Sequence, residues 1–345
     1  MKYHNILLIR TDRIGDVVLT TPAIKLLHEA YPQARLFFLT REYTAPLLKH
    51  HPYLDEILIY SPDDHHRGWA GSLKLSRTLK ERQIDVAFLF YPMASIAFSL
   101  FWAGIPNRIG TGYRWFSFLL NFRKYEHRKY GKKHELEYNL SLLENFIPRL
   151  PTASEITFNF TVDLTLQNLK QRITEEYQIK QEYIIIHPGS GGSAPNLPPE
   201  KYAVILEYLT KYTRYNLILV GDPSEKELIS QIAKQSDADP IQILGDWDLE
   251  TYMAMISGAK YFISNSTGPL HIARAYNVPL LSFYCPAIPC SPERWGPYNR
   301  LEDVLTPPVN PCNTCNINKC PHGNCLAHIS WESIQSQLDK FFTDK

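Results

Sequence analysis

The sequence predicts an α/β fold with two parallel-sheet domains in tandem. Its 345 residues are 44% hydrophobic and 12% aromatic, which is enough for two packed cores. Short apolar segments alternate with helical ones along most of the chain, as in repeated βα units. Some of the apolar segments, such as 86–90, do not alternate in polarity, which is typical of strands covered by helices on both faces.

The first domain is expected over residues 1–150. A segment at 113–133 is less regular and mixes aromatic with basic side chains. It could contact an anionic acceptor or a membrane surface, or it could be a core-packing face with a solvated basic edge. The strands of this domain are expected at 4–9, 35–40, 56–60 and 85–90, and its helices at 17–30, 43–50, 71–82 and 134–146.

The second domain is expected over residues 157–328. Residues 151–156 are the expected linker, because two prolines and little periodicity mark the segment around them. A helix over 331–342 is expected within the last segment, 329–345. Strands are expected at 183–187, 216–220, 241–244, 260–263 and 280–284, and helices near 200–212, 224–234, 249–258 and 269–276.

Charge and hydropathy limit the class of partner and the location. A net charge of +1 and a pI near 7.7 argue against a general nucleic-acid binder. The apolar start of the chain ends at Arg10, too soon for a secretory signal. The longest apolar segment, 94–105, is shorter than the roughly 20 residues that span a bilayer. We therefore expect a cytoplasmic protein with a small or locally recognised partner.

Three loops follow the carboxyl ends of predicted strands, at 11–16, 188–198 and 265–271. Ligands of open parallel sheets bind at this edge. The loops are therefore expected to converge on one central cleft between the two domains.

The first loop offers Asp16 as a candidate general base, with Arg13 and Gly15 in support. Asp16 falls in the first turn of a predicted helix, where the backbone field favours its ionised form. An ionised carboxylate can accept a hydroxyl proton. The alternative is an acid that only stabilises the helix start.

The second loop, 187–196, is rich in glycine and serine and can surround phosphate or sugar oxygens. It is not a P-loop, because no Gly-Lys-Ser/Thr follows, and it contains no G-x-G-x-x-G. These absences weigh against an NTPase and a dinucleotide oxidoreductase. A merely flexible loop is the alternative.

The third loop leads from a strand into a helix through Ser266, Thr267, Gly268 and Pro269. Several unpaired N–H groups should face one point there, which is a site for an anion. A helix N-terminus contributes only about 0.3–1 kcal/mol to an exposed anion. Side chains must assist a departing diphosphate, and His271, Arg274 and Arg13 are the candidates.

Two further motifs suggest metal ligands. Asp246-Trp247-Asp248 has the spacing of cation-binding motifs in sugar-nucleotide enzymes, but Asp248 immediately precedes a predicted helix and is better explained as its cap. All six cysteines lie in the last fifth of the chain. Reduced loop thiols are favoured over a structural zinc site, whose ligands would be Cys312, Cys315, Cys320 and Cys325.

These segments together resemble the ADP-heptose:lipopolysaccharide heptosyltransferase family, glycosyltransferase family 9. The similarity rests on 6–10 followed by 13–22, on 187–190, on 264–273 and on the cysteine-rich segment that ends at Cys325-Leu326. They span almost the whole chain in the family's order.

The resemblance implies a GT-B architecture of two Rossmann-like domains, with the acceptor bound by the first and the nucleotide sugar by the second. It implies inverting, metal-independent transfer without a cofactor, from a donor expected to be ADP-heptose. The implied acceptor is a lipopolysaccharide core or related glycan at the cytoplasmic face of the inner membrane. Asp16 matches the general base. The candidate donor-binding residues are Ser190, Gly191, Asn196, Ser266, Thr267, Gly268, Pro269, Leu270 and His271.

The chain departs from the resemblance at two places. Many family members carry an acid at the position of Ser266 and a lysine near Asn196. Another nucleotide sugar is therefore an alternative donor, and a non-catalytic sugar-nucleotide or glycan-binding protein is an alternative function. Oligomeric state is not indicated by the sequence.

Overall fold

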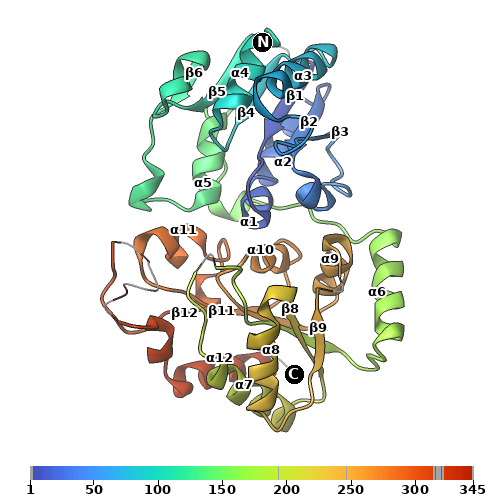
Figure 1. The fold of residues 1–345 in the computed structure, drawn as a ribbon, viewed down its shortest axis with the longest axis vertical. Coiled ribbons are helices and arrows are strands. Elements are labelled where there is room, and N and C mark those ends of the chain that lie inside the picture. Colours follow the sequence, from blue (N-terminus) through green and yellow to red (C-terminus); the bar gives the residue numbers. More distant parts are fainter. Residues whose placement is uncertain are drawn as a thin grey trace. The chain divides into compact units, whose positions relative to one another are not determined.

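The computed structural model describes residues 3–192, 194–245, 247–313, 315, 320 and 322–343. The chain divides into two compact units, each formed by an α/β sheet with its helices (Figure 1). The first unit comprises Met1–Arg128 and Glu135–Thr161. The second comprises Lys129–His134 and Val162–Lys345. Within the described residues, no helix is both long enough and apolar enough to cross a membrane.

The first unit is built on a parallel sheet in the strand order β3-β2-β1-β4-β5-β6. This is the order of a Rossmann sheet. Its strands are β1 (Asn5–Ile9), β2 (Arg35–Thr40), β3 (Glu56–Ile59), β4 (Val86–Leu89), β5 (Asn107–Thr111) and β6 (Phe122–Lys124), and its helices are α1 (Ile14–Val18), α2 (Pro22–Ala30), α3 (Gly68–Glu81), α4 (Ala94–Trp102) and α5 (Glu135–Leu140).

Several elements of this unit differ from expectation for local reasons. The helix expected over 17–30 is two helices, because Pro22 lacks an N–H and starts α2. The helix expected over 43–50 is a 3₁₀ helix, Glu42–Leu47, which contains Pro46. The helix expected over 134–146 ends as α5 at Leu140 and continues as a short 3₁₀ turn. Strands β5 and β6 were not predicted, since polar residues interrupt their apolar pattern.

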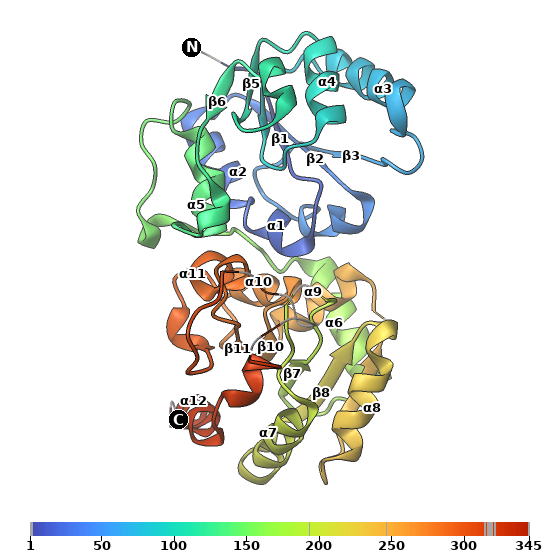
Figure 2. The same cartoon turned by 60° about the vertical axis from the view of Figure 1, so that its left-hand side comes forward.

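The second unit repeats the plan, with the order β12-β11-β10-β7-β8-β9 (Figure 2). Helix α6 was not predicted, because its sequence is largely polar; Asp163 caps it by accepting from Leu166 N at 3.0 Å. The strands are β7 (Tyr183–His187), β8 (Asn216–Gly221), β9 (Ile241–Leu244), β10 (Tyr261–Asn265), β11 (Leu280–Phe283) and β12 (Val304–Leu305), and the helices are α6 (Leu164–Glu176), α7 (Pro199–Tyr212), α8 (Lys226–Lys234), α9 (Leu249–Ser257), α10 (Gly268–Ala275), α11 (Pro292–Trp295) and α12 (Trp331–Thr343).

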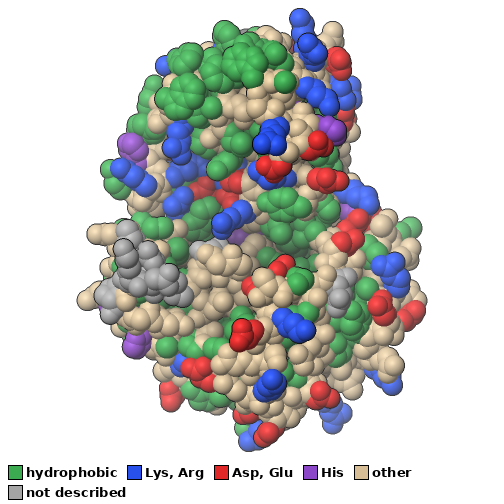
Figure 3. Space-filling model, viewed as in Figure 1, with side chains coloured by type: hydrophobic (Ala, Val, Ile, Leu, Met, Phe, Trp, Pro, Cys, Tyr) green, Lys and Arg blue, Asp and Glu red, His purple; other side chains and the backbone are tan. Residues whose placement is uncertain are grey.

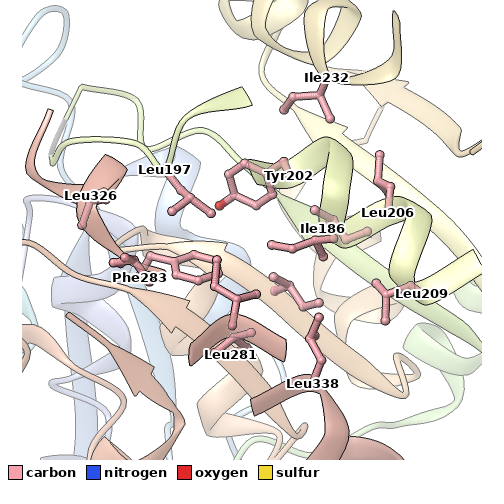
Figure 4. Packing of buried hydrophobic residues seen from close by; sticks show 14 of the residues in the cluster. Ile186, Leu197, Tyr202, Leu206, Leu209, Ile232, Leu281, Phe283, Leu326 and Leu338 are labelled. Atoms are coloured by element: carbon pink, nitrogen blue, oxygen red, sulfur yellow. The ribbon is translucent and has the colours of Figure 1, made fainter. Parts of the chain in front are cut away.

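One core of the second unit lies between its sheet and the helices α7, α8 and α12 (Figure 4). The rings of Tyr202 on α7 and Phe283 on β11 meet edge to face at 5.9 Å between centroids. Ile186 on β7 and Leu338 on α12 are fully buried in the same cluster. The C-terminal helix is therefore part of the core that supports the loops after β7 and β10.

The strand orders fix where ligands can bind in each sheet. The order reverses between β1 and β4 in the first unit and between β7 and β10 in the second. Open α/β sheets bind ligands outside the carboxyl ends of their strands at such a reversal. The loop after β1 and the loops after β7 and β10 are the loops that the sequence had singled out.

Candidate active site

Asp16 lies in the first turn of α1, directly after the carboxyl end of β1. Its carboxylate is 12% exposed and accepts a hydrogen bond from Nη2 of Arg10. Arg10 is itself buried, and it also donates to Asp12 Oδ1 at 2.6 Å and to Asn139 Oδ1 at 3.0 Å. The guanidinium therefore joins the loop after β1 to helix α5.

A second arginine completes this network. Arg128 pairs with Glu135 and donates to Asn139 Oδ1 at 3.1 Å, while Glu135 Oε1 lies 3.6 Å from Arg10 Nη2. The amide of Asn139 donates to Thr20 Oγ1 at 3.1 Å. Each of the two arginines, Arg10 and Arg128, is thus paired with a buried carboxylate, and both donate to Asn139. These charge-assisted hydrogen bonds hold each side chain in one orientation.

The environment of Asp16 raises its pKa to about 7. Burial is the main cause; Arg10 lowers the pKa, while Asp12 and Glu135 raise it. The sequence predicted that the helix field favours the ionised form of Asp16, whereas burial is the dominant influence and favours the neutral form. A carboxylate that titrates near neutrality is suited to accept a proton at physiological pH.

The two supporting residues of the first loop have different surroundings. Arg13 is exposed at the N-cap of α1, and Gly15 is buried inside that helix. Among the described residues, no side-chain hydrogen bond caps α1. Arg13 is therefore accessible to a ligand at the start of the helix.

In the second unit, Asn265 at the end of β10 anchors the loop after β7. Its Oδ1 accepts from Leu197 N at 2.9 Å, and its Nδ2 donates to the carbonyl of Pro188 and to Asn196 Oδ1 at 3.3 Å. Asn324 Nδ2 holds the carbonyl of Asn196 from the other side at 2.9 Å. Asn196 thus lies beside the third loop, and its contact with a donor stays a prediction.

Glu225 fixes the glycine-rich part of the same loop. It accepts from Gly191 N at 3.2 Å and from Asp222 N at 3.0 Å. A Cβ at Gly189 would lie 1.7 Å from the Glu225 carboxylate, so glycine at this position lets Glu225 keep its place. Ser190 is buried and donates to the carbonyl of Ala194 at 2.7 Å. Side-chain hydrogen bonds therefore fix the conformation of this loop, which is not only a flexible glycine segment.

Helix α10 begins at Gly268, with Thr267 as its N-cap residue in an extended conformation. Within the described part of the chain, no side-chain hydrogen bond caps this helix, and Pro269 in its first turn has no N–H. Leu270 is fully buried under the first turn. The remaining N–H groups of this turn are the expected anion donors.

The two candidate side chains on α10, His271 and Arg274, differ in charge and in their partners. Burial, and then His134, lower the pKa of His271 to about 3, so its imidazole is neutral. Its Nδ1 has no hydrogen-bond partner among the described residues. Arg274 donates to the carbonyl of Tyr298 at 2.6 Å and to Asn277 Oδ1 at 2.7 Å, which fixes it to a neighbouring loop. His271 can offer a neutral N–H rather than a charge.

Tyr252 was not singled out from the sequence, and His187 was named only as the first residue of the glycine-rich loop, with no role of its own. His187 at the end of β7 forms a 2.8 Å hydrogen bond through Nδ1 with the hydroxyl of Tyr252 on α9. Burial lowers the pKa of His187, although Glu225 and Asp222 oppose the effect. The neutral pair of His187 and Tyr252 lies at the base of the glycine-rich loop. Nearby, Ser266, one of the two departures from the resemblance, hydrogen bonds to Tyr284.

The possible metal ligands do not assemble in the described residues. No group of three or more His, Cys, Asp and Glu side chains there is arranged to hold an ion. Asp248 caps α9, accepting from Thr251 N at 2.8 Å, as predicted, while Asp246 lies outside the described residues. All six cysteines are free, and the sulfurs of Cys285 and Cys315 lie 3.7 Å apart.

Some of these positions had a readable signal and others did not. Asp222 and Glu225 have the spacing of a capping box, which the structure forms. No local pattern could indicate that Asn139 meets Arg10, because 129 positions separate them. The same holds for Asn265 and Leu197, which are 68 positions apart.

Two Rossmann-like sheets, each with candidate ligand loops at its strand reversal, define an α/β protein of the GT-B class. A family model described as glycosyltransferase family 9 (heptosyltransferase) matches residues 72–326, so the chain belongs to this family and is a glycosyltransferase. Its relatives include a candidate glycosyltransferase of Haemophilus influenzae, 28% identical over 335 residues that cover 95% of this chain and 96% of the relative.

Solved structures show the same fold. A family 9 glycosyl transferase from Veillonella parvula superposes with a TM-score of 0.84 at 18% identity, covering 100% of this chain and 98% of the other. The E. coli ADP-heptose lipopolysaccharide heptosyltransferase II superposes with a TM-score of 0.77 at 20% identity, covering 100% and 99%. The GT-B expectation is confirmed.

Proposed function

We propose that this chain transfers a heptose from ADP-heptose to a hydroxyl of a lipopolysaccharide core, with Asp16 as general base and inversion at the anomeric carbon. The observation that carries the proposal is the buried carboxylate of Asp16, whose pKa of about 7 suits a base, at the strand reversal of the first sheet. The proposed place of action is the cytoplasmic face of the inner membrane, where a lipid-anchored acceptor would be presented.

The proposed reaction is a single displacement. Asp16 takes the proton of the acceptor hydroxyl while that oxygen forms a bond to the anomeric carbon of the donor. The bond from this carbon to the phosphate oxygen breaks, and ADP leaves with the electron pair. Attack from the face opposite the leaving group inverts the configuration. Arg10 orients the carboxylate through their buried hydrogen bond.

The second unit is proposed to hold the donor. The first turn of α10 supplies N–H groups from the Gly268 end, and the loop anchored by Asn265 and Glu225 surrounds the diphosphate. A partly buried helix N-terminus contributes up to roughly 2 kcal/mol to an anion, so further donors are needed. His271 offers a neutral N–H, and Arg13, which is exposed at the start of α1, stays the cation predicted from the sequence.

The choice of donor rests on the relatives. The E. coli structure named above is described as an ADP-heptose enzyme. The proposal is therefore ADP-heptose, and the hydrogen bond of Ser266 to Tyr284 marks the position at which sugar preference is expected to differ within the family.

A direct test measures binding and transfer separately. Thermal shifts with ADP, UDP, GDP and CDP, each free and sugar-linked, rank the donors, since stabilisation grows with the ratio of ligand concentration to Kd. Transfer to a heptose-deficient core acceptor is then followed by mass spectrometry, with and without a chelator, and the linkage is assigned by NMR. Transfer of another sugar would overturn the proposed donor, and retention of configuration would overturn the proposed inverting mechanism. Donor binding without any transfer favours the non-catalytic alternative.

A further inference from the structure

The first unit carries a cluster of aromatic side chains at its surface, three of them exposed and two half-buried. We call Trp69, Phe98, Trp102, Trp115 and Phe118 the aromatic patch. Trp69 is 64% exposed, Trp115 72% and Phe118 61%. Figure 3 shows a broad hydrophobic area on the surface of this unit. Single exposed apolar residues are ordinary, but contiguous aromatic surfaces mark interaction sites.

The patch is assembled from three elements that pack together: α3, α4 and a 3₁₀ helix over Trp115–Leu119 (Figure 2). Ring centroids of Trp69 and Trp102 are 4.3 Å apart, those of Phe98 and Trp102 are 5.3 Å apart, and those of Phe98 and Trp115 are 6.1 Å apart. The patch is therefore continuous from α3 to the 3₁₀ helix.

The sequence of the 3₁₀ helix explains why its rings face outward. Residues three apart share a face in a 3₁₀ helix, so Trp115 and Phe118 lie on one side. Phe116 and Leu119, on the other side, are buried in the core of the unit. The core is satisfied without Trp115 and Phe118, and their exposure is not a consequence of core packing.

Positive charge accompanies the patch. Residues 67–124 contain nine Lys or Arg and two Asp or Glu, although the whole chain has a net charge of only +1. Arg67 and Arg114 are exposed and lie within two residues of Trp69 and Trp115. Lys74 and Arg77 are exposed on α3. The partner of this face should thus combine an apolar layer with negative charge.

We propose that the aromatic patch docks on the surface of an anionic phospholipid bilayer. Tryptophan rings settle at the boundary between headgroups and acyl chains, because they are apolar but carry one polar N–H. Nearby basic side chains bind the anionic headgroups. The inference rests on the proposed function in one respect: docking there would bring the first unit to a lipid-anchored acceptor.

Vesicle sedimentation of the full-length protein tests the proposal. The variant Trp115→Ser/Phe118→Ser removes two exposed rings, and Leu164→Ser/Tyr212→Ser is the matched control, since these residues are 74% and 53% exposed in the second unit. Wild type should sediment with phosphatidylethanolamine–phosphatidylglycerol vesicles and much less with phosphatidylcholine. The patch variant should lose roughly tenfold or more in partitioning, and the control should not.

Charge is tested separately from the rings. Lys74→Glu/Arg77→Glu should weaken sedimentation at low salt, and salt should weaken that of the wild type. Unfolding midpoints show whether each variant is folded. The proposal is overturned if wild type does not bind anionic vesicles, or if the folded patch variant binds them as well as the control does.

Two further measurements are needed. One shows whether the partner of the patch is a bilayer or a second copy of the chain, and the other separates docking from catalysis. Light scattering of wild type and the patch variant detects self-association; a dimer lost in the variant, without vesicle binding, would make the partner a second copy. Transfer to a water-soluble acceptor fragment reports the proposed function independently. Patch-dependent vesicle binding without transfer would retain the docking surface and refute the enzyme.

Discussion

Arg10 and Asp16 form a buried ion pair in which the carboxyl group still has a pKa of about 7. Burial raises the pKa of Asp16 more than Arg10 lowers it, and Asp12 and Glu135 raise it further. Burial also lowers the pKa of Arg10, but the three carboxylates together raise it above its usual value. The guanidinium thus stays charged and orients Asp16 without fixing it in the ionised form.

The first prediction concerns the pH dependence of transfer. The rate should rise with pH through about 7, because the pKa of Asp16 lies there and the ionised form is the base. Glu135→Gln removes one of the charges that raise this pKa, so the midpoint of kcat/KM against pH should move to lower pH. Asp63→Asn, an exposed acid that pairs with Arg41, is the control and should leave the midpoint unchanged. An unshifted midpoint in Glu135→Gln would contradict the electrostatic account.

The second prediction separates the base from its neighbour. Asp16→Asn should lower transfer by roughly 10²–10⁴ while donor affinity stays nearly constant, because an amide cannot accept the proton. Asp12→Asn is the matched control: Asp12 also pairs with Arg10, at 2.6 Å, and should lose much less. Kinetics and calorimetric titration of the donor measure both. An unchanged rate in Asp16→Asn removes the residue from its proposed role.

The third prediction concerns the amide that holds the donor loop. Asn265→Ala leaves the buried N–H of Leu197 and the carbonyl of Pro188 without their partner, which costs about 1–3 kcal/mol for each buried group left unpaired. KM for the donor should rise more than kcat falls. Asn324→Ala removes the 2.9 Å bond to the Asn196 carbonyl and the 3.2 Å bond from Leu326 N, but it leaves the bonds to Leu197 N and the Pro188 carbonyl in place, so KM for the donor should rise less. Equal effects of the two variants would argue against a special anchor at Asn265.

The fourth prediction uses a steric relationship. In Gly189→Ala the new Cβ would lie 1.7 Å from the present position of the Glu225 carboxylate. Glu225 should therefore move and lose its hydrogen bond from Gly191 N. The loss should be about 0.5–1.5 kcal/mol of stability, together with weaker donor binding. In a double-mutant cycle with Glu225→Ala the two effects should not add. Gly192→Ala, with φ of +72° and open space at its Cβ, controls for backbone strain alone. Additive effects would show that Gly189 acts independently of Glu225.

Most of the fold could be predicted from the sequence, because its core strands are continuous apolar segments that end at polar loops. Apolar strands such as 35–40 and 183–187 were found at the predicted positions. Strand β6 was missed because it has three residues, two of them exposed, and no apolar pattern. Helix α6 was missed because its polar face outweighs its two buried residues, Leu166 and Ile173.

Parts of the candidate site could be predicted where neighbouring residues in the sequence determine a residue's position, as for Asp16 at the start of a helix. It was not readable where the environment comes from distant segments. The pKa of Asp16 depends on Glu135, and the neutral state of His271 depends on burial and on His134. The sequence gives the ordinary pKa of each side chain. The shift that desolvation causes depends on how the chain is packed, so it could not be predicted.

The last prediction concerns a buried histidine outside the candidate site. Burial lowers the pKa of His51 to about 4, and its Nε2 has no hydrogen-bond partner among the described residues. Native His51 therefore stays neutral at pH values where the unfolded chain, with an ordinary histidine pKa near 6.5, is protonated. Its stabilising contribution is complete above pH 6.5 and is lost as the pH falls toward 4.

Between pH 7 and pH 5 this linkage should cost about 2 kcal/mol of unfolding free energy. His51→Gln keeps an acceptor for Tyr53 N, which lies 3.4 Å from Nδ1, but cannot titrate. Its unfolding free energy should therefore fall by about 2 kcal/mol less than that of the wild type over the same interval. His65→Gln, at a side chain that is 64% exposed, is the control and should follow the wild type. Urea unfolding at both pH values measures the difference. Equal losses in wild type and His51→Gln would mean that the imidazole gains a proton without leaving its buried place.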